Sequence, residues 1–145
     1  MDYYPLLSDK AGKRLLVRFR SADGSEHEEV IRPITAGQLS SLLYRRWVNQ
    51  RAAEVDKASG GKYGYVHIPS MGDEHFRTVY SEALGRYYDR KGIVIDIRYN
   101  GGGRLHEDIE VFFSGKQYLT QEVRGKDYCE MPSRRWNKPS VMLTC

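Results

Sequence analysis

The chain opens with two strand-like segments. Residues 13–20 and 28–34 mix apolar and charged residues, and an Asp23-Gly24 pair lies between them. An Asp-Gly pair between two such segments favours a tight reversal of the chain. The pattern therefore predicts a β-hairpin.

A helical period follows the hairpin. Leu39, Leu43 and Trp47 recur every four residues, Thr35 is a suitable N-cap, and no proline interrupts the stretch. We expect one long amphipathic helix over residues 36–59, ended by the Gly-Gly pair that follows it.

From residue 60 onward, strand-like and helical patterns alternate, which favours a parallel or mixed sheet with crossover helices. The expected strands cover residues 63–69, 93–98, 117–124 and 140–145, and the expected helices cover residues 76–87 and 105–113. Ser70 and Asp73 have the spacing of a capping box before the first of these helices. Residues 125–138, with two prolines, are expected to be irregular. Because the last apolar strand continues to the final residue, we expect the chain to be part of a longer protein.

The composition is that of a globular protein of about one domain: 145 residues, 40% apolar and 12% aromatic. No apolar run approaches the roughly 20 residues of a membrane-spanning helix, and the first residues lack the pattern of a secretory signal, so any signal peptide is expected to lie outside this chain. The net charge of +4 is scattered along the chain. We therefore expect neither a membrane span nor a nucleic-acid partner, and the localisation stays open between cytoplasmic and periplasmic or secreted.

No cofactor or metal site is expected. Cys129 and Cys145 belong to neither a zinc-type cluster nor a disulfide framework, so we interpret both as reduced bystanders. The glycine pattern is neither G-x-G-x-x-G nor a Walker sequence, which disfavours nucleotide binding.

The most informative segment is the Asn-Gly-Gly-Gly sequence of residues 100–103, between a predicted strand and a predicted helix. Main-chain N–H groups at such a place form a donor-rich hollow suited to an oxyanion or a phosphate. A plain glycine-rich connection explains the same residues equally well. The chemical interpretation requires the amides of residues 100–104 to point toward one shared vacancy.

Other candidate side chains favour structural roles. Asp96 and Arg98 point to the same side of a strand and are expected to pair. His67, on a strand, is expected to be a structural histidine. His106, just after the glycines, is expected to lie on a helix surface rather than to take part in catalysis. His27 and His75 have no evident companion.

No serine lies in a G-x-S-x-G elbow. The serines considered are Ser59, Ser70, Ser81, Ser114, Ser133 and Ser140. The segment 133–138 could stack a base or bind an acidic peptide, but we expect a surface loop with Trp136 turned inward.

Three segments together carry a resemblance: YRRWVNQR (44–51), SGGKYGYVHIPSMG (59–72) and IVIDIRYNGGG (93–103). In this order and spacing they resemble the tricorn protease branch of the C-terminal processing (tail-specific) serine peptidase family. Residues 138–145 resemble the family's strand that leads into the nucleophile loop.

The resemblance implies an incomplete crotonase/ClpP-like β-α-β core over residues 60–145. Residues 1–35, which contain the hairpin, would be the C-terminal part of a PDZ-like domain. Residues 36–59 would be the linking helix between the two.

For function, the resemblance implies proteolysis of peptides or unfolded polypeptide through an acyl-enzyme intermediate, without a cofactor. The oxyanion donor carries over to the main-chain N–H of Gly102, with Gly103 next in line. The family's nucleophile and base lie outside this chain, so the chain alone is expected to be inactive. Relatives in this branch oligomerise, and the apolar strand edge at residues 140–145 predicts association between copies.

Two alternatives stay open. The first is a noncatalytic peptide-binding or scaffolding member of the same fold. The second is an acyl-thioester enzyme of crotonase type, which rests on shared architecture alone.

Overall fold

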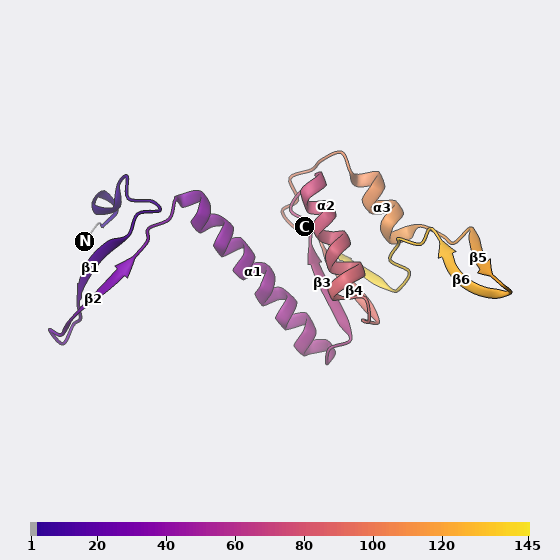
Figure 1. Cartoon of the computed structure of the whole chain (residues 1–145), viewed down its shortest axis with the longest axis horizontal. Coiled ribbons are helices and arrows are strands. Elements are labelled where there is room, and N and C mark those ends of the chain that lie inside the picture. Colours follow the sequence, from indigo (N-terminus) through magenta and orange to yellow (C-terminus); the bar gives the residue numbers. More distant parts are fainter. Residues whose placement is uncertain (1–2) are drawn as a thin grey trace. The chain divides into compact units, whose positions relative to one another are not determined.

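A computed structural model describes residues 3–145. The chain divides into two compact units, Met1–Trp47 and Val48–Cys145, and the long helix α1 (Ala36–Ser59) runs through the division (Figure 1). No helix within the described residues is long and apolar enough to cross a membrane.

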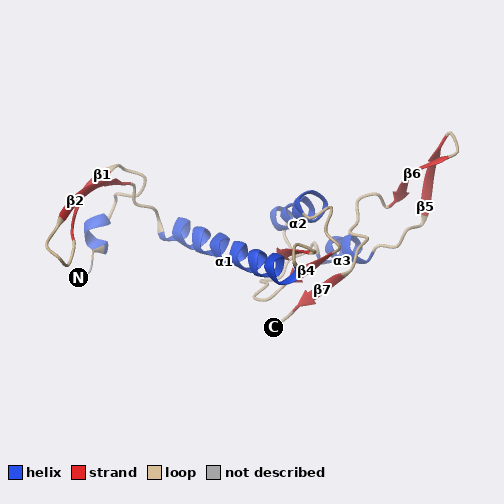
Figure 2. Cartoon of the chain, turned by 90° about the horizontal axis from the view of Figure 1, so that it is seen from below, coloured by secondary structure: helices blue, strands red, loops and turns tan. Residues whose placement is uncertain are grey.

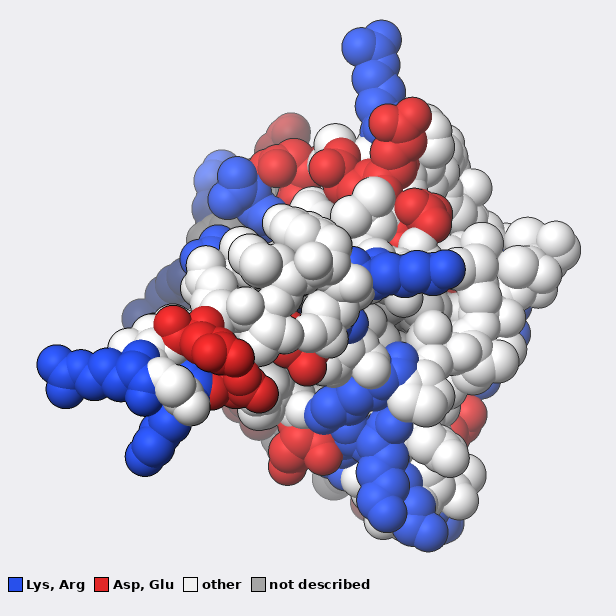
Figure 3. Space-filling model, turned by 90° about the vertical axis from the view of Figure 1, so that its right-hand side faces the viewer, with Lys and Arg blue, Asp and Glu red and all other residues white. Residues whose placement is uncertain are grey.

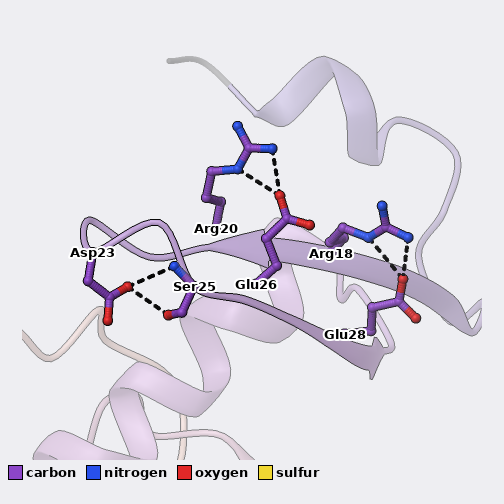
Figure 4. Close-up of polar contacts among 6 residues, drawn as sticks. All are labelled: Arg18, Arg20, Asp23, Ser25, Glu26 and Glu28. Carbon is purple, nitrogen blue, oxygen red and sulfur yellow. Dashed lines mark hydrogen bonds and ion pairs between the residues drawn. The ribbon is translucent and has the colours of Figure 1, made fainter.

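The first unit contains the predicted hairpin. A short 3-10 helix, η1 (Tyr4–Leu7), precedes the antiparallel strands β1 (Leu15–Arg20) and β2 (Glu26–Ile31). Cross-strand ion pairs reinforce the register: Arg18 and Arg20 bind the carboxylates of Glu28 and Glu26 at 2.7 and 2.5 Å (Figure 4). Because all four side chains are exposed, these pairs contribute little free energy of folding.

The turn of this hairpin is organised by Asp23. Its Oδ1 accepts hydrogen bonds from the main-chain N–H and the hydroxyl of Ser25, at 2.9 and 2.6 Å (Figure 4). Gly24 supplies the positive φ of +85° that the reversal requires. The Asp-Gly signal of the sequence is confirmed.

Helix α1 begins and ends as predicted. The Gln38 N–H donates to Thr35 Oγ1 (3.2 Å) while the Thr35 N–H donates to Gln38 Oε1 (2.9 Å), which is a reciprocal capping box. At the other end Gly60 and Gly61 both have positive φ, and the Gly61 N–H closes on the carbonyl of Asp56 (2.8 Å).

The second unit is built on a parallel three-stranded sheet in the order β3-β4-β7, which confirms the α/β prediction. The strands are β3 (Tyr63–His67), β4 (Gly92–Asp96) and β7 (Ser140–Leu143). The crossover from β3 to β4 contains α2 (Asp73–Ser81) and its π-helical continuation η2 (Glu82–Arg86), and that from β4 to β7 contains α3 (His106–Ser114).

The core lies where these helices pack on the sheet. Apolar side chains of β3 and β4 meet those of α2, η2 and α3, and Trp136 closes the cluster from the last connection. The buried cluster consists of Val66, Ile68, Val79, Ala83, Tyr87, Ile93, Ile95, Ile109, Phe112 and Trp136. The inward position expected for Trp136 is confirmed, since its side chain is 4% exposed.

One predicted irregular region is instead a strand. β5 (Leu119–Val123) pairs antiparallel with β6 (Lys126–Met131), so residues 125–138 are only partly irregular. Arg124 and Gly125 both have positive φ, which is the backbone of a tight hairpin turn. Figures 1 and 2 show this hairpin extending away from the three-stranded sheet.

The capping box predicted for Ser70 and Asp73 is wrong. The N-cap of α2 is Gly72, and no side chain caps it. Ser70 Oγ instead lies 2.8 Å from Nδ1 of His75, so the hydroxyl is engaged by a side chain of the first helical turn.

Candidate functional site: the loop after β4

The carboxyl ends of β3 and β4 lie side by side, and the loops that leave them are bonded to each other. Residues 69–72 follow β3, and residues 97–105 follow β4 (Figure 1). In open parallel α/β sheets, this edge is where ligands bind. The candidate site therefore lies at the end of β4 and in the loop that follows it.

At the end of β4, Asp96 is completely buried. Its carboxylate accepts hydrogen bonds from the Tyr65 hydroxyl (2.7 Å) and from Arg98 Nε and Nη2 (2.9 and 2.6 Å). The Arg98 main-chain N–H adds a further bond at 3.0 Å. The pairing predicted for Asp96 and Arg98 is confirmed, and Tyr65 is a partner that the sequence did not reveal.

These contacts shift the pKa values of Asp96, Tyr65 and Arg98. Burial by itself would raise the pKa of Asp96, but the hydrogen bonds from Arg98 and Tyr65 outweigh it and lower the pKa to about 2. Burial, then the bond to the carboxylate, raises the pKa of Tyr65. The bond to Asp96 likewise raises the pKa of Arg98. The group is therefore an ionised carboxylate held by a neutral phenol and a guanidinium.

Two side chains then fasten the loop to the end of β3. His67 Nε2 lies 2.9 Å from the Arg98 carbonyl oxygen, which gives His67 the structural role expected for it. Asn100 bonds in both directions, because its Nδ2 donates to the Ile68 carbonyl (2.7 Å) and its Oδ1 accepts from the Gly102 N–H (2.7 Å). The role of Asn100 was not predicted from the sequence.

Gly103 lies too close to Met71 for a side chain to fit. The two residues form an isolated parallel bridge, in which the Met71 N–H donates to the Gly102 carbonyl (2.8 Å) and the Met71 carbonyl accepts from the Leu105 N–H (3.0 Å). A Cβ on Gly103 would lie 2.3 Å from the Met71 carbonyl oxygen, and its φ is +148°. Both facts restrict this position to glycine.

The same bridge sets the direction of the Gly103 N–H. In a trans peptide the C=O and N–H point in opposite directions, and the Gly102–Gly103 bond is trans. Because the Gly102 carbonyl points at Met71, the Gly103 N–H points away from Met71. Within residues 3–145, this N–H has no hydrogen-bond acceptor.

The chemical interpretation required all the amides of this loop to point toward one vacancy. The structure shows that they do not. The Gly101 N–H donates to the Pro69 carbonyl (2.9 Å), and the Gly102 N–H is engaged by Asn100. In this conformation the Gly103 N–H is available to a ligand, and the Arg104 N–H likewise has no acceptor within residues 3–145. A Gly102 donor would require Asn100 to release or share its hydrogen bond.

The remaining candidates are not brought to this donor. Ser70 and His75 form their own pair, but the Gly103 N–H points away from the segment that contains Ser70. His27 stacks on Phe19 in the hairpin (5.3 Å between ring centroids), and His106 is the exposed first residue of α3.

Neither cysteine forms a disulfide: Cys129 is half-buried and Cys145 exposed. Across the described residues, no group of three or more His, Cys, Asp or Glu side chains could hold a metal ion. Basic and acidic side chains are interspersed on the face drawn in Figure 3.

Comparison with known proteins agrees with this architecture. The model of Peptidase family S41 matches residues 62–145. The chain thus belongs to peptidase family S41, a class of hydrolases, and residues 62–145 contain both the three-stranded sheet and the glycine loop.

Within this family the chain is tricorn-like. It is 42% identical over 104 residues to a putative tricorn-like protease C-terminal subunit of Sulfurisphaera tokodaii, a match covering 70% of this chain and 12% of that protein. It is 29% identical over 142 residues to the tricorn protease of Thermoplasma acidophilum, covering 86% of this chain and 13% of that protein. The crystal structure of the tricorn protease matches with a TM-score of 0.67 and 25% identity, over 97% of this chain and 13% of that chain. The chain thus spans about an eighth of the length of these relatives.

Proposed function

We propose that this chain is the oxyanion-binding part of a serine peptidase. The single observation that carries the proposal is the Gly103 N–H, which has no acceptor within residues 3–145 and points away from Met71. Main-chain donors fixed in this way stabilise the negative oxygen of a tetrahedral intermediate. Gly103 is the principal donor, and Gly102 contributes when Asn100 yields its hydrogen bond.

The reaction we propose is acyl transfer from a peptide or an unfolded polypeptide to a serine, followed by hydrolysis. The serine would follow β7 in the longer protein. The base would also come from outside this chain. An oxyanion donor without nucleophile and base gives little catalysis, so the chain alone should be inactive.

The wider organisation is proposed from the family resemblance. Residues 1–35 would be the end of a PDZ-like domain, residues 36–59 a linker, and residues 60–145 the first part of a crotonase-like core. A homo-oligomeric assembly is supported by the free edge of β7. Its apolar side chains Val141 and Met142 are 54% and 50% exposed, an arrangement that favours a further strand or a partner.

The test compares this chain with the longer protein that contains it. We expect the longer protein to degrade reduced, carboxymethylated casein and to be labelled on serine by a fluorophosphonate, and the 145-residue chain to do neither. Replacing the amide that donates from Gly103 by an ester removes that N–H and also makes the Gly102 carbonyl a weaker acceptor for the Met71 N–H. This change should lower kcat of the longer protein about 100-fold or more.

The matched control is the same ester at Gly24, in the turn of the β1–β2 hairpin, which should leave kcat unchanged. An unchanged kcat with the ester at Gly103 would refute the oxyanion role. If the longer protein binds casein but neither cleaves it nor reacts with the fluorophosphonate, the noncatalytic scaffolding function is correct instead.

A further inference from the structure

We infer that a groove between α2 and α3 binds an arginine side chain of a polypeptide. The groove has a volume of about 370 Å³ and lies wholly within the second unit. Its lining consists of Phe76, Tyr80, Glu107, Asp108, Val111, Phe112 and Arg134. This recognition goes beyond the proposed peptidase chemistry and does not depend on it.

Aromatic rings form the apolar part of the groove. Phe76 and Tyr80, one helical turn apart on α2, are half-buried, whereas Phe112 of α3 is 3% exposed. The centroids of Phe76 and Tyr80 lie 6.3 and 5.5 Å from that of Phe112. Phe112 is covered, so the half-buried rings of Phe76 and Tyr80 supply the surface on which a cation with an apolar stem can stack.

The charged part of the groove has a surplus of negative charge. Glu107 and Asp108 lie in the first turn of α3, and Arg134 comes from the loop that follows β6. None of these three side chains forms an ion pair or a hydrogen bond to another described residue. The lining therefore carries two carboxylates and one guanidinium, so a bound cation would neutralise its surplus negative charge.

An arginine side chain fits both parts at once. Its planar guanidinium stacks on aromatic rings and forms paired hydrogen bonds to carboxylates, while its methylene stem covers apolar surface. A lysine ammonium carries the charge but lacks the planar face. Arginine should therefore bind more tightly than lysine.

The experiment uses the 145-residue chain and three capped tripeptides, Ac-Gly-Arg-Gly-NH2, the lysine analogue, and the neutral citrulline analogue of the same shape as arginine. Titrations are followed by NMR chemical shifts of Phe76, Tyr80 and Phe112. We expect the arginine peptide to shift these signals with a dissociation constant several-fold below that of lysine. The citrulline peptide should bind at least about tenfold more weakly than arginine.

Substituted variants distinguish binding in this groove from nonspecific attraction of a cationic peptide to acidic side chains. E107Q and D108N together should weaken arginine binding about tenfold, and R134Q should strengthen it. E110Q removes one charge from the same helix outside the groove and should change nothing. Equal binding of the citrulline peptide, shifts that miss the three rings, or an equal loss in E110Q would overturn the proposal. Because no turnover is measured, these results are independent of the peptidase proposal.

Discussion

Asp96 and Arg98, two residues apart, are joined by a two-pronged ion pair at the point where β4 ends. Arg98 Nε bonds Asp96 Oδ1 at 2.9 Å and its Nη2 bonds Oδ2 at 2.6 Å, while Tyr65 holds the same carboxylate from β3. The pair fixes the first residues of the loop that presents the Gly103 N–H. A group buried for structural reasons thus determines where the candidate donor lies.

The first prediction concerns the replacement D96N. It keeps the shape of the side chain but leaves the Arg98 guanidinium and the Tyr65 hydroxyl without an ionised acceptor. Because Arg98 is partly exposed and can regain water, we expect a loss of about 3 kcal/mol in the free energy of unfolding. Urea unfolding followed by circular dichroism measures it.

The control for D96N is Y65F, which removes one neutral donor and should cost about 1 kcal/mol. D73N removes an exposed carboxylate of α2, whose partner Arg77 is also exposed, and should cost less than about 0.5 kcal/mol. A loss in D96N no larger than that in D73N would contradict the role given to Asp96.

The second prediction is a pH dependence with a defined sign. The pKa of Asp96 is lowered from 3.8 to about 2 in the folded protein, so the folded state binds this proton more weakly than the unfolded state. The resulting stabilisation is fully present above pH 4 and is lost as the pH falls toward 2. It amounts to about 2 kcal/mol.

This contribution is isolated by comparing the wild type with D96N. The difference in their unfolding free energies should shrink by about 2 kcal/mol between pH 5 and pH 2, although both proteins lose stability from other carboxylates. A difference that stays constant over this range would show that Asp96 does not titrate as its contacts require.

Local sequence signals were sufficient to predict most helices and strands of the fold. Asp23 and Gly24 marked one hairpin, Thr35 began α1, and the β-branched run of β4 identified a strand buried on both faces. Each of these signals acts over a few residues and needs no knowledge of the rest of the chain. The β5–β6 hairpin was missed because its turn, Arg124-Gly125, is not one of the strong turn pairs.

The geometry of the site depends on contacts between distant residues, which local patterns do not encode. Tyr65 meets Asp96 only because β3 and β4 pair in a register that sets them near each other. The sequence predicts no more than a loop position for Asn100, yet its side chain bonds Ile68 on one side and Gly102 on the other. Such a role follows from the parallel pairing of two loops, not from any spacing along one of them.

The third prediction tests Asn100 as the fastener of the loop. In N100A the Gly102 N–H loses its acceptor and the Ile68 carbonyl loses a donor, so the amide of Gly102 should exchange with solvent at least about tenfold faster. N100D keeps an acceptor for the Gly102 N–H but places a negative charge where Asn100 donated to the Ile68 carbonyl, so it should restore part of the protection. Hydrogen exchange by NMR gives the rates, and equal exchange in N100A and the wild type would refute this role.

The fourth prediction compares two neighbouring glycines. At Gly102 a Cβ would meet nothing within 4 Å, so G102A suffers only from the positive φ of +86°, a cost of about 1 kcal/mol. At Gly103 the Cβ would lie 2.3 Å from the Met71 carbonyl oxygen, and main-chain atoms must move to relieve the overlap. G103A should therefore break the bridge to Met71, with the amides of Met71 and Leu105 losing their protection from exchange, whereas G102A keeps it. Similar protection of these two amides in both variants would show that the close approach of Gly103 to Met71 does not hold the loop in place.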